Sequence, residues 1–458
     1  MVKHYHLIGI GGIGMSGIAR LLLCRGFKVS GSDIKESDST VELRRRGAEV
    51  LLGHDPANVN GADEVIYSSA IGEDNPEVRQ AVAVGVAVKK RAEALAELMQ
   101  DKTVITVTGS HGKTTTSSLI SYLLLEAGLR PTIAVGGILK NIDSNARMGD
   151  GQFFVAEADE SDGSFLCYQP DYSVITNVDR EHLDYYRDFG SEIKAFSKFI
   201  DQTKAGGCVF ACSDDPVLKG LLDDYEGRRV FFGLKENADI FPRNISIAAL
   251  SSEFDCFYKG ACLGRFCLSL GGMHNISNSL AVIAIGLELG LEAGLIRRAL
   301  GNYQGARRRM ETKFKSPAYL VIDDYAHHPS EIKATLEATE RLKSKRVIVV
   351  FQPHRYSRTK LLWDEFPVSF GKADYLVLTD IYPASEKAIA GIDGESLCLR
   401  IKKDTPGKEV RFLNKEKIVG HILEIIEPGD LVVVMGAGDI VRIADELALR
   451  LRGEDKVS

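Results

Sequence analysis

The segment 108–115, Thr-Gly-Ser-His-Gly-Lys-Thr-Thr, combines residue types that bind phosphate groups. It follows a β-branched run over 103–107 and precedes an apolar helical pattern over 117–125, so we expect a strand, a glycine turn and a helix. At such a turn the backbone N–H groups surround a phosphate chain, Lys113 adds a positive charge, and a threonine hydroxyl can bind magnesium. The pattern Gly-x-x-Gly-Lys-Thr is two residues shorter than the usual phosphate loop, and the alternative is an ordinary glycine turn. We predict an ATP site that includes Gly109, Ser110, His111, Gly112, Lys113, Thr114 and Thr115.

Carboxylates follow a second expected strand. The apolar run 153–156 leads to the acidic residues Glu157, Asp159, Glu160 and Asp162. Another strand, over 172–176, leads to Asn177, Asp179 and His182. Because the carboxyl ends of parallel strands meet at one edge of a sheet, we expect these groups beside the ATP phosphates, where they can hold divalent cations. Most of these acids are better interpreted as solvated charges or helix caps. We therefore predict Thr114, Glu157 and His182 as the metal ligands.

A second glycine turn lies near the start of the chain. Gly9-Ile-Gly-Gly-Ile-Gly14 follows an expected strand over 5–8 and precedes an apolar helix, and Asp33 comes about twenty residues later. Alone, this fingerprint predicts a dinucleotide site, but the same turn can hold any diphosphate. A substrate that is itself a nucleotide diphosphate would account for both glycine turns. We predict contacts from Gly11, Gly12, Gly14 and Asp33, with a solvated turn residue as the alternative for Asp33.

Three further groups can contact ligands. Asn275 and Asn278 open an apolar helix over 279–289 and can contact a base or ribose, although Asn275 can equally be a helix cap. The arginines at 307–309 suit a transferring phosphoryl group or a diphosphate, with a solvated basic loop as the alternative. After two late strands come polar segments that contain Asp323, Asp324, His354, Arg355 and Arg358. The last two arginines are placed to bind a carboxylate.

Length and composition indicate a multidomain globular protein. At 458 residues the chain accommodates about three domains. Its net charge of -6 favours neither nucleic acid nor an anionic membrane as a partner. Its eight cysteines contain no Cys-x-x-Cys pair, which is typical of neither a zinc site nor a disulfide framework and favours a reducing cytoplasm.

Strand, glycine turn and helix recur near residues 6–23, 103–125 and 431–440, which predicts α/β domains with parallel sheets. We expect boundaries that give domains at 1–100, 101–311 and 312–458.

Six motifs resemble, in the same order, those of the Mur ligases. They are the glycine turn 7–17, the phosphate loop 108–116, the acidic segment 157–165, His274-Asn-Ile-Ser-Asn278, Asp323-Asp-Tyr-Ala-His-His-Pro329 and Pro353-His-Arg-Tyr-Ser-Arg358. The resemblance extends from Tyr5 to Asp439. It implies three domains: an N-terminal Rossmann-like domain that binds a UDP-sugar, a central P-loop-type ATPase domain and a C-terminal Rossmann-like domain that brings the amino acid.

The resemblance favours the alanine-adding branch of the family. It implies ATP and Mg²⁺ as cofactors and UDP-N-acetylmuramate and L-alanine as substrates, joined through an acyl phosphate in peptidoglycan precursor synthesis. It assigns catalytic roles to Lys113, Glu157, His182, Arg309 and Asp324. It adds Arg309 to the ATP site, adds Ser32 and Ser69 to the UDP-sugar site, and places His354, Arg355 and Arg358 at the amino acid. We expect a cytoplasmic monomer or homodimer.

One departure from the family pattern is Ser110, where threonine is usual, although a hydroxyl is retained. Lys198 lies where some related ligases carry a carbamylated lysine, and we leave it out of the site. Two alternatives stay open. One is a recycling ligase that attaches a preformed tripeptide to the same nucleotide sugar. The other is a protein of a different class, a nucleotide-binding protein without catalysis or a Rossmann oxidoreductase.

Overall fold

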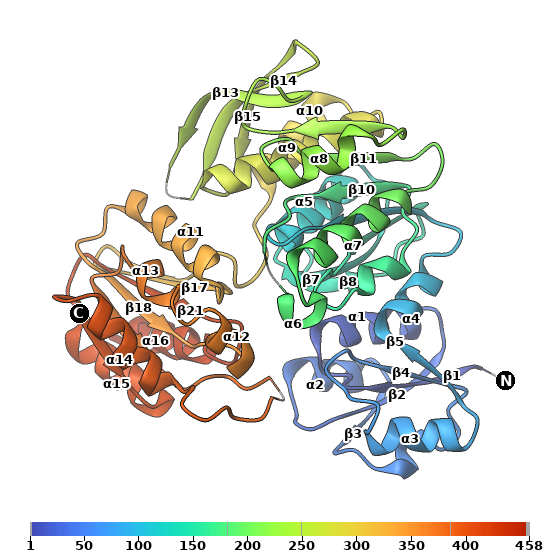
Figure 1. The fold of residues 1–458 in the computed structure, drawn as a ribbon, viewed down its shortest axis with the longest axis horizontal. Helices are drawn as coiled ribbons and strands as arrows, with labels where there is room; N and C mark the ends of the chain where they lie inside the picture. Colours follow the sequence, from blue (N-terminus) through green and yellow to red (C-terminus); the bar gives the residue numbers. More distant parts are fainter. Residues whose placement is uncertain (1, 181, 249, 385, 455–458) are drawn as a thin grey trace. The chain divides into compact units, whose positions relative to one another are not determined.

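The computed structural model describes residues 2–180, 182–248, 250–384 and 386–454 (Figure 1). The chain forms two compact units. The first contains residues 1–247 and 251–306, and the second contains residues 307–458 with 248–250. Together they contain three sheets flanked by helices, which confirms the predicted three-domain α/β class. The exact boundaries after residues 100 and 311 remain predictions.

The N-terminal sheet has five parallel strands in the order β3-β2-β1-β4-β5. The strands are β1 (His4–Ile8), β2 (Lys28–Asp33), β3 (Glu49–Leu52), β4 (Glu64–Tyr67) and β5 (Ala87–Lys90). The helices are α1 (Ile13–Cys24), α2 (Asp38–Arg45), the short η1 (Pro56–Val59), α3 (Pro76–Ala83) and α4 (Arg91–Leu98). Gly12 is the N-cap of α1, so the glycine turn joins β1 to α1 at the carboxyl edge of the sheet.

The charged stretch 89–98 is divided between a strand and a helix. Its first two residues belong to β5, and α4 starts only at Arg91. The boundary falls there because the Glu93 carboxylate accepts a hydrogen bond from the Lys90 backbone N–H at 2.7 Å and so caps the helix.

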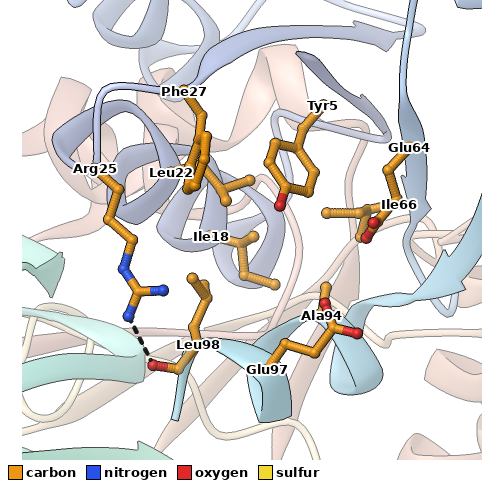
Figure 2. Close-up of a pocket in the computed structure, with 10 residues that line it drawn as sticks. All are labelled: Tyr5, Ile18, Leu22, Arg25, Phe27, Glu64, Ile66, Ala94, Glu97 and Leu98. Atoms are coloured by element: carbon orange, nitrogen blue, oxygen red, sulfur yellow. Dashed lines mark hydrogen bonds between the residues drawn. The ribbon is translucent and has the colours of Figure 1, made fainter. Parts of the chain in front are cut away.

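The later parts of α1 and α4 lie toward the amino-terminal edge of the same sheet. Figure 2 shows Ile18 of α1 between Tyr5 of β1 and Leu98 of α4, and Arg25 donates a 2.9 Å hydrogen bond to the Leu98 carbonyl. These residues surround a hollow of about 150 Å³. Because Tyr5 and Glu64 lie at the beginnings of β1 and β4, the hollow is at the opposite edge of the sheet from the glycine turn.

The central sheet has ten strands in the order β15-β14-β13-β12-β11-β10-β6-β9-β7-β8. They are β6 (Thr103–Thr108), β7 (Thr132–Leu139), β8 (Ser144–Arg147), β9 (Phe153–Glu157), β10 (Tyr172–Ile175), β11 (Cys208–Cys212), β12 (Arg229–Phe232), β13 (Ile240–Ile247), β14 (Ser252–Tyr258) and β15 (Ala261–Leu268). The helices are α5 (Lys113–Glu126), η2 (Ser164–Cys167), α6 (Leu183–Tyr186), α7 (Phe189–Asp201), α8 (Pro216–Asp223), α9 (Met273–Glu288) and α10 (Ala293–Asn302).

This sheet is mixed, whereas the sequence predicted a parallel one. Strands β7, β9, β6, β10, β11 and β12 run parallel, but β8, β14 and β15 pair antiparallel to their neighbours. Lys259 and Gly260 connect β14 to β15, and both have positive φ, 48° and 82°. A two-residue turn of this kind joins antiparallel strands, because a parallel connection needs many more residues.

The C-terminal sheet has the order β16-β17-β21-β18-β19-β20, and only β16 is antiparallel to its neighbour. Its strands are β16 (Glu311–Lys315), β17 (Tyr319–Asp324), β18 (Val347–Phe351), β19 (Tyr375–Leu378), β20 (Glu409–Phe412) and β21 (Asp430–Met435). Its helices are α11 (Pro329–Thr339), η3 (Glu340–Leu342), α12 (Tyr356–Leu361), α13 (Phe366–Ser369), α14 (Gly394–Asp404), α15 (Lys415–Ile425) and α16 (Val441–Glu454).

Helices bury both faces of this sheet. Along β18, Val347, Val349 and Phe351 belong to one hydrophobic cluster, whereas Ile348 and Val350 belong to another. Since successive strand side chains point to opposite faces, the continuous apolar run reflects burial on both sides. Polar residues that follow such strands therefore emerge at the sheet edge. Within the described part of the chain, we find no helix with the length and apolar character needed to span a membrane.

Candidate active site

The predicted phosphate loop connects β6 to α5, and the segment after β10 fixes its conformation. The backbone N–H of His111 donates to Asn177 Oδ1 at 2.8 Å, and that of Ser110 donates to the Asn177 carbonyl at 3.1 Å. The Ser110 hydroxyl oxygen accepts from the Asp179 N–H at 2.7 Å. Gly112, the N-cap of α5, has φ 82°, a conformation that glycine adopts at low cost. The loop therefore ends at a helix N-terminus, whose N–H groups can bind phosphate.

The loop residue Lys113 is held by a buried carboxylate, that of Glu160. Its ammonium group donates to Glu160 Oε1 and to the Gly109 carbonyl, both at 2.7 Å. Burial alone would lower the pKa of Lys113, but the negative charges of Glu160, Asp159 and Glu157 raise it above its ordinary value. Lys113 is therefore a permanent cation at the start of α5, where it can interact with phosphate oxygens.

Thr114 and Glu157 form a second pair beside Lys113. The Thr114 hydroxyl donates to Glu157 Oε2 at 3.0 Å, and the Gly136 N–H donates to the same oxygen at 2.9 Å. A Cβ atom at position 136 would lie 2.6 Å from this carboxylate, so a larger residue there would force the Glu157 carboxylate to move. Burial raises the pKa of Glu157, and the charge of Lys113 opposes that rise.

The oxygen atoms of Thr114 and Glu157 suit a magnesium ion that a bound nucleotide also coordinates. The described residues contain no group of three His, Cys, Asp or Glu side chains arranged to hold a metal ion. Mg²⁺ in nucleotide sites, however, is commonly bound by one or two protein oxygens together with substrate phosphates and water. The paired hydroxyl and carboxylate oxygens of Thr114 and Glu157 match this donor type.

His182, the third predicted metal ligand, lies beside Glu160. Its Nε2 atom is 3.2 Å from Glu160 Oε1, so His182 and Lys113 approach the same carboxylate oxygen. Its φ of 57° places it in the left-handed region just before α6. Its role as a metal ligand remains a prediction.

The first turn of α9 approaches the phosphate loop. The side-chain amide of Asn275 donates to the Gly271 carbonyl at 2.8 Å, so it stabilises the beginning of its own helix. Asn278 lies against Gly112, where a Cβ atom would come within 2.6 Å of Asn278 Oδ1. Of these two amides, Asn278 is the one that the structure brings to the loop, and nucleotide contact by either remains a prediction. Thr115 is half-buried on α5.

At the N-terminal glycine turn, several predicted ligand residues have partners within the protein. Asp33 Oδ2 accepts a hydrogen bond from the Gly11 N–H at 2.9 Å and so stabilises the turn. The Ser32 hydroxyl is buried and donates to Glu77 at 2.5 Å. Ser69 is exposed after β4. A Cβ atom at Gly14 would lie 3.1 Å from Cδ of Arg91, so this glycine leaves space for an arginine. UDP-sugar contact by these residues, Gly12 included, remains a prediction.

In the second unit, the three consecutive arginines have different surroundings. Arg308 Nε donates to Asp323 Oδ2 at 3.1 Å, and its Nη1 donates to the Gly438 carbonyl at 3.0 Å. It therefore cross-links this domain. Arg307 is exposed, and the Arg309 guanidinium lies over the Tyr325 ring, 5.3 Å from its centroid.

Asp324 organises the same region. Its Oδ2 accepts from the Met310 N–H at 2.7 Å, and its Oδ1 accepts from the Ala326 N–H at 2.9 Å and the Thr335 hydroxyl at 3.1 Å. Burial raises the pKa of Asp324, whereas the charge of Arg309 opposes this effect. Asp324 thus positions the loop that carries Arg309, and catalytic roles for both residues remain predictions.

The residues predicted to bind the amino acid gather after β18. Arg358 Nη1 donates to His354 Nδ1 at 3.1 Å, and the His354 ring stacks on Tyr382 with centroids 5.6 Å apart. The buried Nε atom of Arg355 has no hydrogen-bond partner among the described residues. Burial, followed by the charges of His327 and Arg358, lowers the pKa of His354 to about 2. Two guanidinium groups beside a neutral imidazole suit a carboxylate ligand.

Comparison with known proteins shows to which protein family this chain belongs. Three family models match the chain: "Mur ligase family, catalytic domain" over residues 4–103, "Mur ligase middle domain" over 107–286, and "Mur ligase, glutamate ligase domain" over 308–438. A protein of Syntrophus aciditrophicus named UDP-N-acetylmuramate–L-alanine ligase is 46% identical over 98% of this chain and 94% of its own length. This chain belongs to the Mur ligase family.

Solved Mur ligase structures have the same fold. The UDP-N-acetylmuramate-alanine ligase of Thermotoga maritima is 30% identical, with a TM-score of 0.86 over 99% of this chain and all of that chain. The murein peptide ligase of Psychrobacter arcticus is 23% identical, with a TM-score of 0.75 over 98% of both chains. The similarity to the Psychrobacter arcticus structure shows only that the two proteins share a fold.

Three residues of this Mur ligase's candidate site were not selected from the sequence. The sequence pattern does not separate Glu160 from the solvated acids, although it is the partner of Lys113. In the sequence Asn177 is one residue of a polar segment, whereas in the structure it bonds both the N–H and the carbonyl of His111. The sequence does not single out Arg91, and only its contact with the glycine turn distinguishes it. The signal that could have found Glu160 is its place in the segment that directly follows β9, the strand next to the loop-bearing strand β6.

Proposed function

We propose that this protein joins L-alanine to the carboxylate of UDP-N-acetylmuramate at the expense of ATP, a step of peptidoglycan precursor synthesis. The observation that carries the proposal is the 46% identity over 98% of the chain to a protein with that name. The geometry supports it, since a phosphate loop with a permanent cation and a separate cluster of arginines suit a nucleotide and a carboxylate substrate. Through this step we propose a part in cell-wall growth, cell shape and division.

In the proposed reaction the muramyl carboxylate becomes an acyl phosphate, which the amine of L-alanine attacks with release of phosphate. Lys113 and the N–H groups at the start of α5 would hold the transferred phosphoryl group and offset its negative charge. Thr114 and Glu157 would hold Mg²⁺, with His182 as a further predicted ligand. When bound, the ion neutralises charge on the phosphate oxygens.

The second unit would supply the amino acid. Arg355 and Arg358, next to His354, would bind the carboxylate of L-alanine and leave its amine to react. Since neutral His354 adds no charge, the guanidinium groups supply the electrostatic attraction. The remaining contribution of the protein is positioning, and well-oriented partners reach effective molarities on the order of 10⁵ M or more. We propose a cytoplasmic monomer or homodimer that binds neither nucleic acid nor membrane.

The test is phosphate release from ATP and Mg²⁺ in the presence of UDP-N-acetylmuramate. Three reactions are compared: with L-alanine, with the tripeptide L-Ala-γ-D-Glu-meso-diaminopimelate, and with no amine. We expect turnover only with L-alanine. Turnover only with the tripeptide would move the protein to the recycling branch, and no turnover in any reaction would favour a binding protein.

A further inference from the structure

Arg355 begins α12 in a backbone conformation that is rare for a residue with a side chain. It is the N-cap of the helix, with φ 69° and ψ 138°, and its side chain forms no capping hydrogen bond. N-caps are usually Ser, Thr, Asp or Asn, whose side-chain oxygen accepts from the first N–H groups of the helix. An arginine side chain contains no acceptor. The first turn of α12 therefore needs an acceptor from elsewhere, and neighbouring contacts must hold the strained backbone of Arg355.

Glu386 supplies that acceptor from the connection between β19 and α14. Its Oε2 accepts from the Ser357 backbone N–H at 3.0 Å, and its Oε1 accepts from the Ser357 hydroxyl at 2.6 Å. Ser357 is the second residue of α12, so the carboxylate takes the place of an N-cap side chain. Glu386 lies 29 positions further along the chain, and it therefore ties two connections of the sheet together.

The same connection also holds the backbone at Arg355 and just before it. The Arg355 N–H donates to the Tyr382 carbonyl, and the Tyr382 N–H donates to the Pro353 carbonyl, both at 2.8 Å. His354 and Tyr382 form a parallel bridge, and their rings are stacked. Tyr382 and Glu386 thus fix the chain on both sides of the strained position.

Glu386 acts on the backbone rather than on a guanidinium group. Among the described residues it forms no ion pair with a lysine or arginine, although Arg355 and Arg358 are close to Ser357 in the sequence. An ion pair with Glu386 would compete with a ligand carboxylate for the same guanidinium. The buried Nε atom of Arg355, which has no hydrogen-bond partner in the described part of the chain, is instead left for a ligand.

We infer that Glu386 is a positioning residue for the amino-acid substrate. It holds the first turn of α12, and with it Arg355 and Arg358, in the orientation that binds the carboxylate of the amino acid. This inference rests on the proposed function, in which both arginines bind that carboxylate. In this role Glu386 does not touch the substrate and acts through the Ser357 backbone.

Steady-state phosphate release by the full chain tests the inference. KM is measured for L-alanine, for ATP with Mg²⁺ and for UDP-N-acetylmuramate, each with the other two substrates saturating. For Glu386→Ala we expect the KM for L-alanine to rise about 10-fold, because hydrogen bonds to a charged group are lost, and the other two KM values to stay unchanged. For Glu386→Gln we expect a rise of about 2- to 3-fold, because the amide oxygen still accepts from the Ser357 N–H but carries no charge.

The matched control is Asp393→Ala. Asp393 caps α14 by accepting from the Ser396 N–H at 2.7 Å, and α14 carries neither Arg355 nor Arg358. Thermal melting should show a comparable loss of stability in Asp393→Ala and Glu386→Ala, because each variant loses one helix cap. Only Glu386→Ala should change the KM for L-alanine.

A double-variant cycle separates positioning from a general loosening of the domain. If Glu386 acts through the arginines, Glu386→Ala combined with Arg358→Met should raise the KM for L-alanine little more than Arg358→Met alone. Circular dichroism checks that each variant is folded.

Three results would overturn the inference. They are an unchanged KM for L-alanine in folded Glu386→Ala, an equal rise of all three KM values, and fully additive effects of Glu386→Ala and Arg358→Met. An unmodified protein that releases no phosphate with L-alanine would refute the proposed function itself, and this inference with it.

Discussion

Replacement of Glu160 by glutamine tests whether a buried carboxylate holds the phosphate-loop lysine. The Glu160 side chain is 0% exposed and Lys113 is 15% exposed, with their atoms 2.7 Å apart. At this distance the pair attraction is about 6 kcal/mol for an effective dielectric constant near 20, and desolvation offsets part of it. Removal of one partner leaves a buried charge without its counterion, which typically costs about 3 to 5 kcal/mol.

For Glu160→Gln we expect the lower value, about 3 kcal/mol, because the amide oxygen can still accept a hydrogen bond from Lys113. Differential scanning calorimetry should show the melting temperature reduced by roughly 5 °C, because the compact unit that contains the pair has about 300 residues. Saturating ATP should restore part of this loss, since phosphate oxygens can take the place of the carboxylate and ligands stabilise the state they bind.

The matched control is Asp150→Asn. Asp150 pairs with Arg130 at 3.0 Å, but these side chains are 67% and 69% exposed. Exposed pairs contribute about 0 to 1 kcal/mol, so this variant should melt within about 2 °C of the unmodified protein. Equal melting temperatures for both variants would refute the argument that burial, rather than distance, gives the Glu160 pair its strength.

Three further predictions concern the loop, the histidines and the metal. Gly112→Ala should destabilise by at least about 1 to 2 kcal/mol and weaken ATP binding, because φ is 82° and the new Cβ would lie 2.6 Å from Asn278 Oδ1; an unchanged melting temperature would contradict this. His327 and His354 have folded pKa values lowered from 6.5 to about 3 and about 2, chiefly by burial. The two histidines therefore contribute to the stability of the folded state above pH 6.5. This contribution is lost as the pH falls below 6.5, because the unfolded chain binds the protons. The melting temperature of the second unit should fall steeply as the pH drops below 6.5, and less steeply in His327→Gln. Equal slopes of melting temperature against pH in the two proteins would contradict this role of the buried histidines. Removal of divalent ions with EDTA should abolish phosphate release and leave UDP-N-acetylmuramate affinity unchanged by calorimetry; turnover without metal would refute the role of Thr114 and Glu157.

Several features of the fold and site were predictable because they depend on local patterns. The strand over 153–157 and the strand–turn–helix over 103–126 follow from β-branched runs, glycines and an apolar helical period. Given a parallel core, Thr114 and Glu157 had to approach one another, since β6 and β9 are neighbours and their carboxyl ends meet. The antiparallel strands β13 to β15 have weaker signals, and the sequence did not predict them.

By itself, then, the sequence determined the types of local element, the presence of a phosphate loop and the family resemblance. Only the tertiary structure decided which side chains are partners. Lys113 pairs with Glu160 across 47 positions of the chain, and Arg91 reaches Gly14 from another helix. No periodicity encodes such pairs. They depend on which strands are neighbours and on which glycines leave space for a side chain, and both properties arise only when the elements pack.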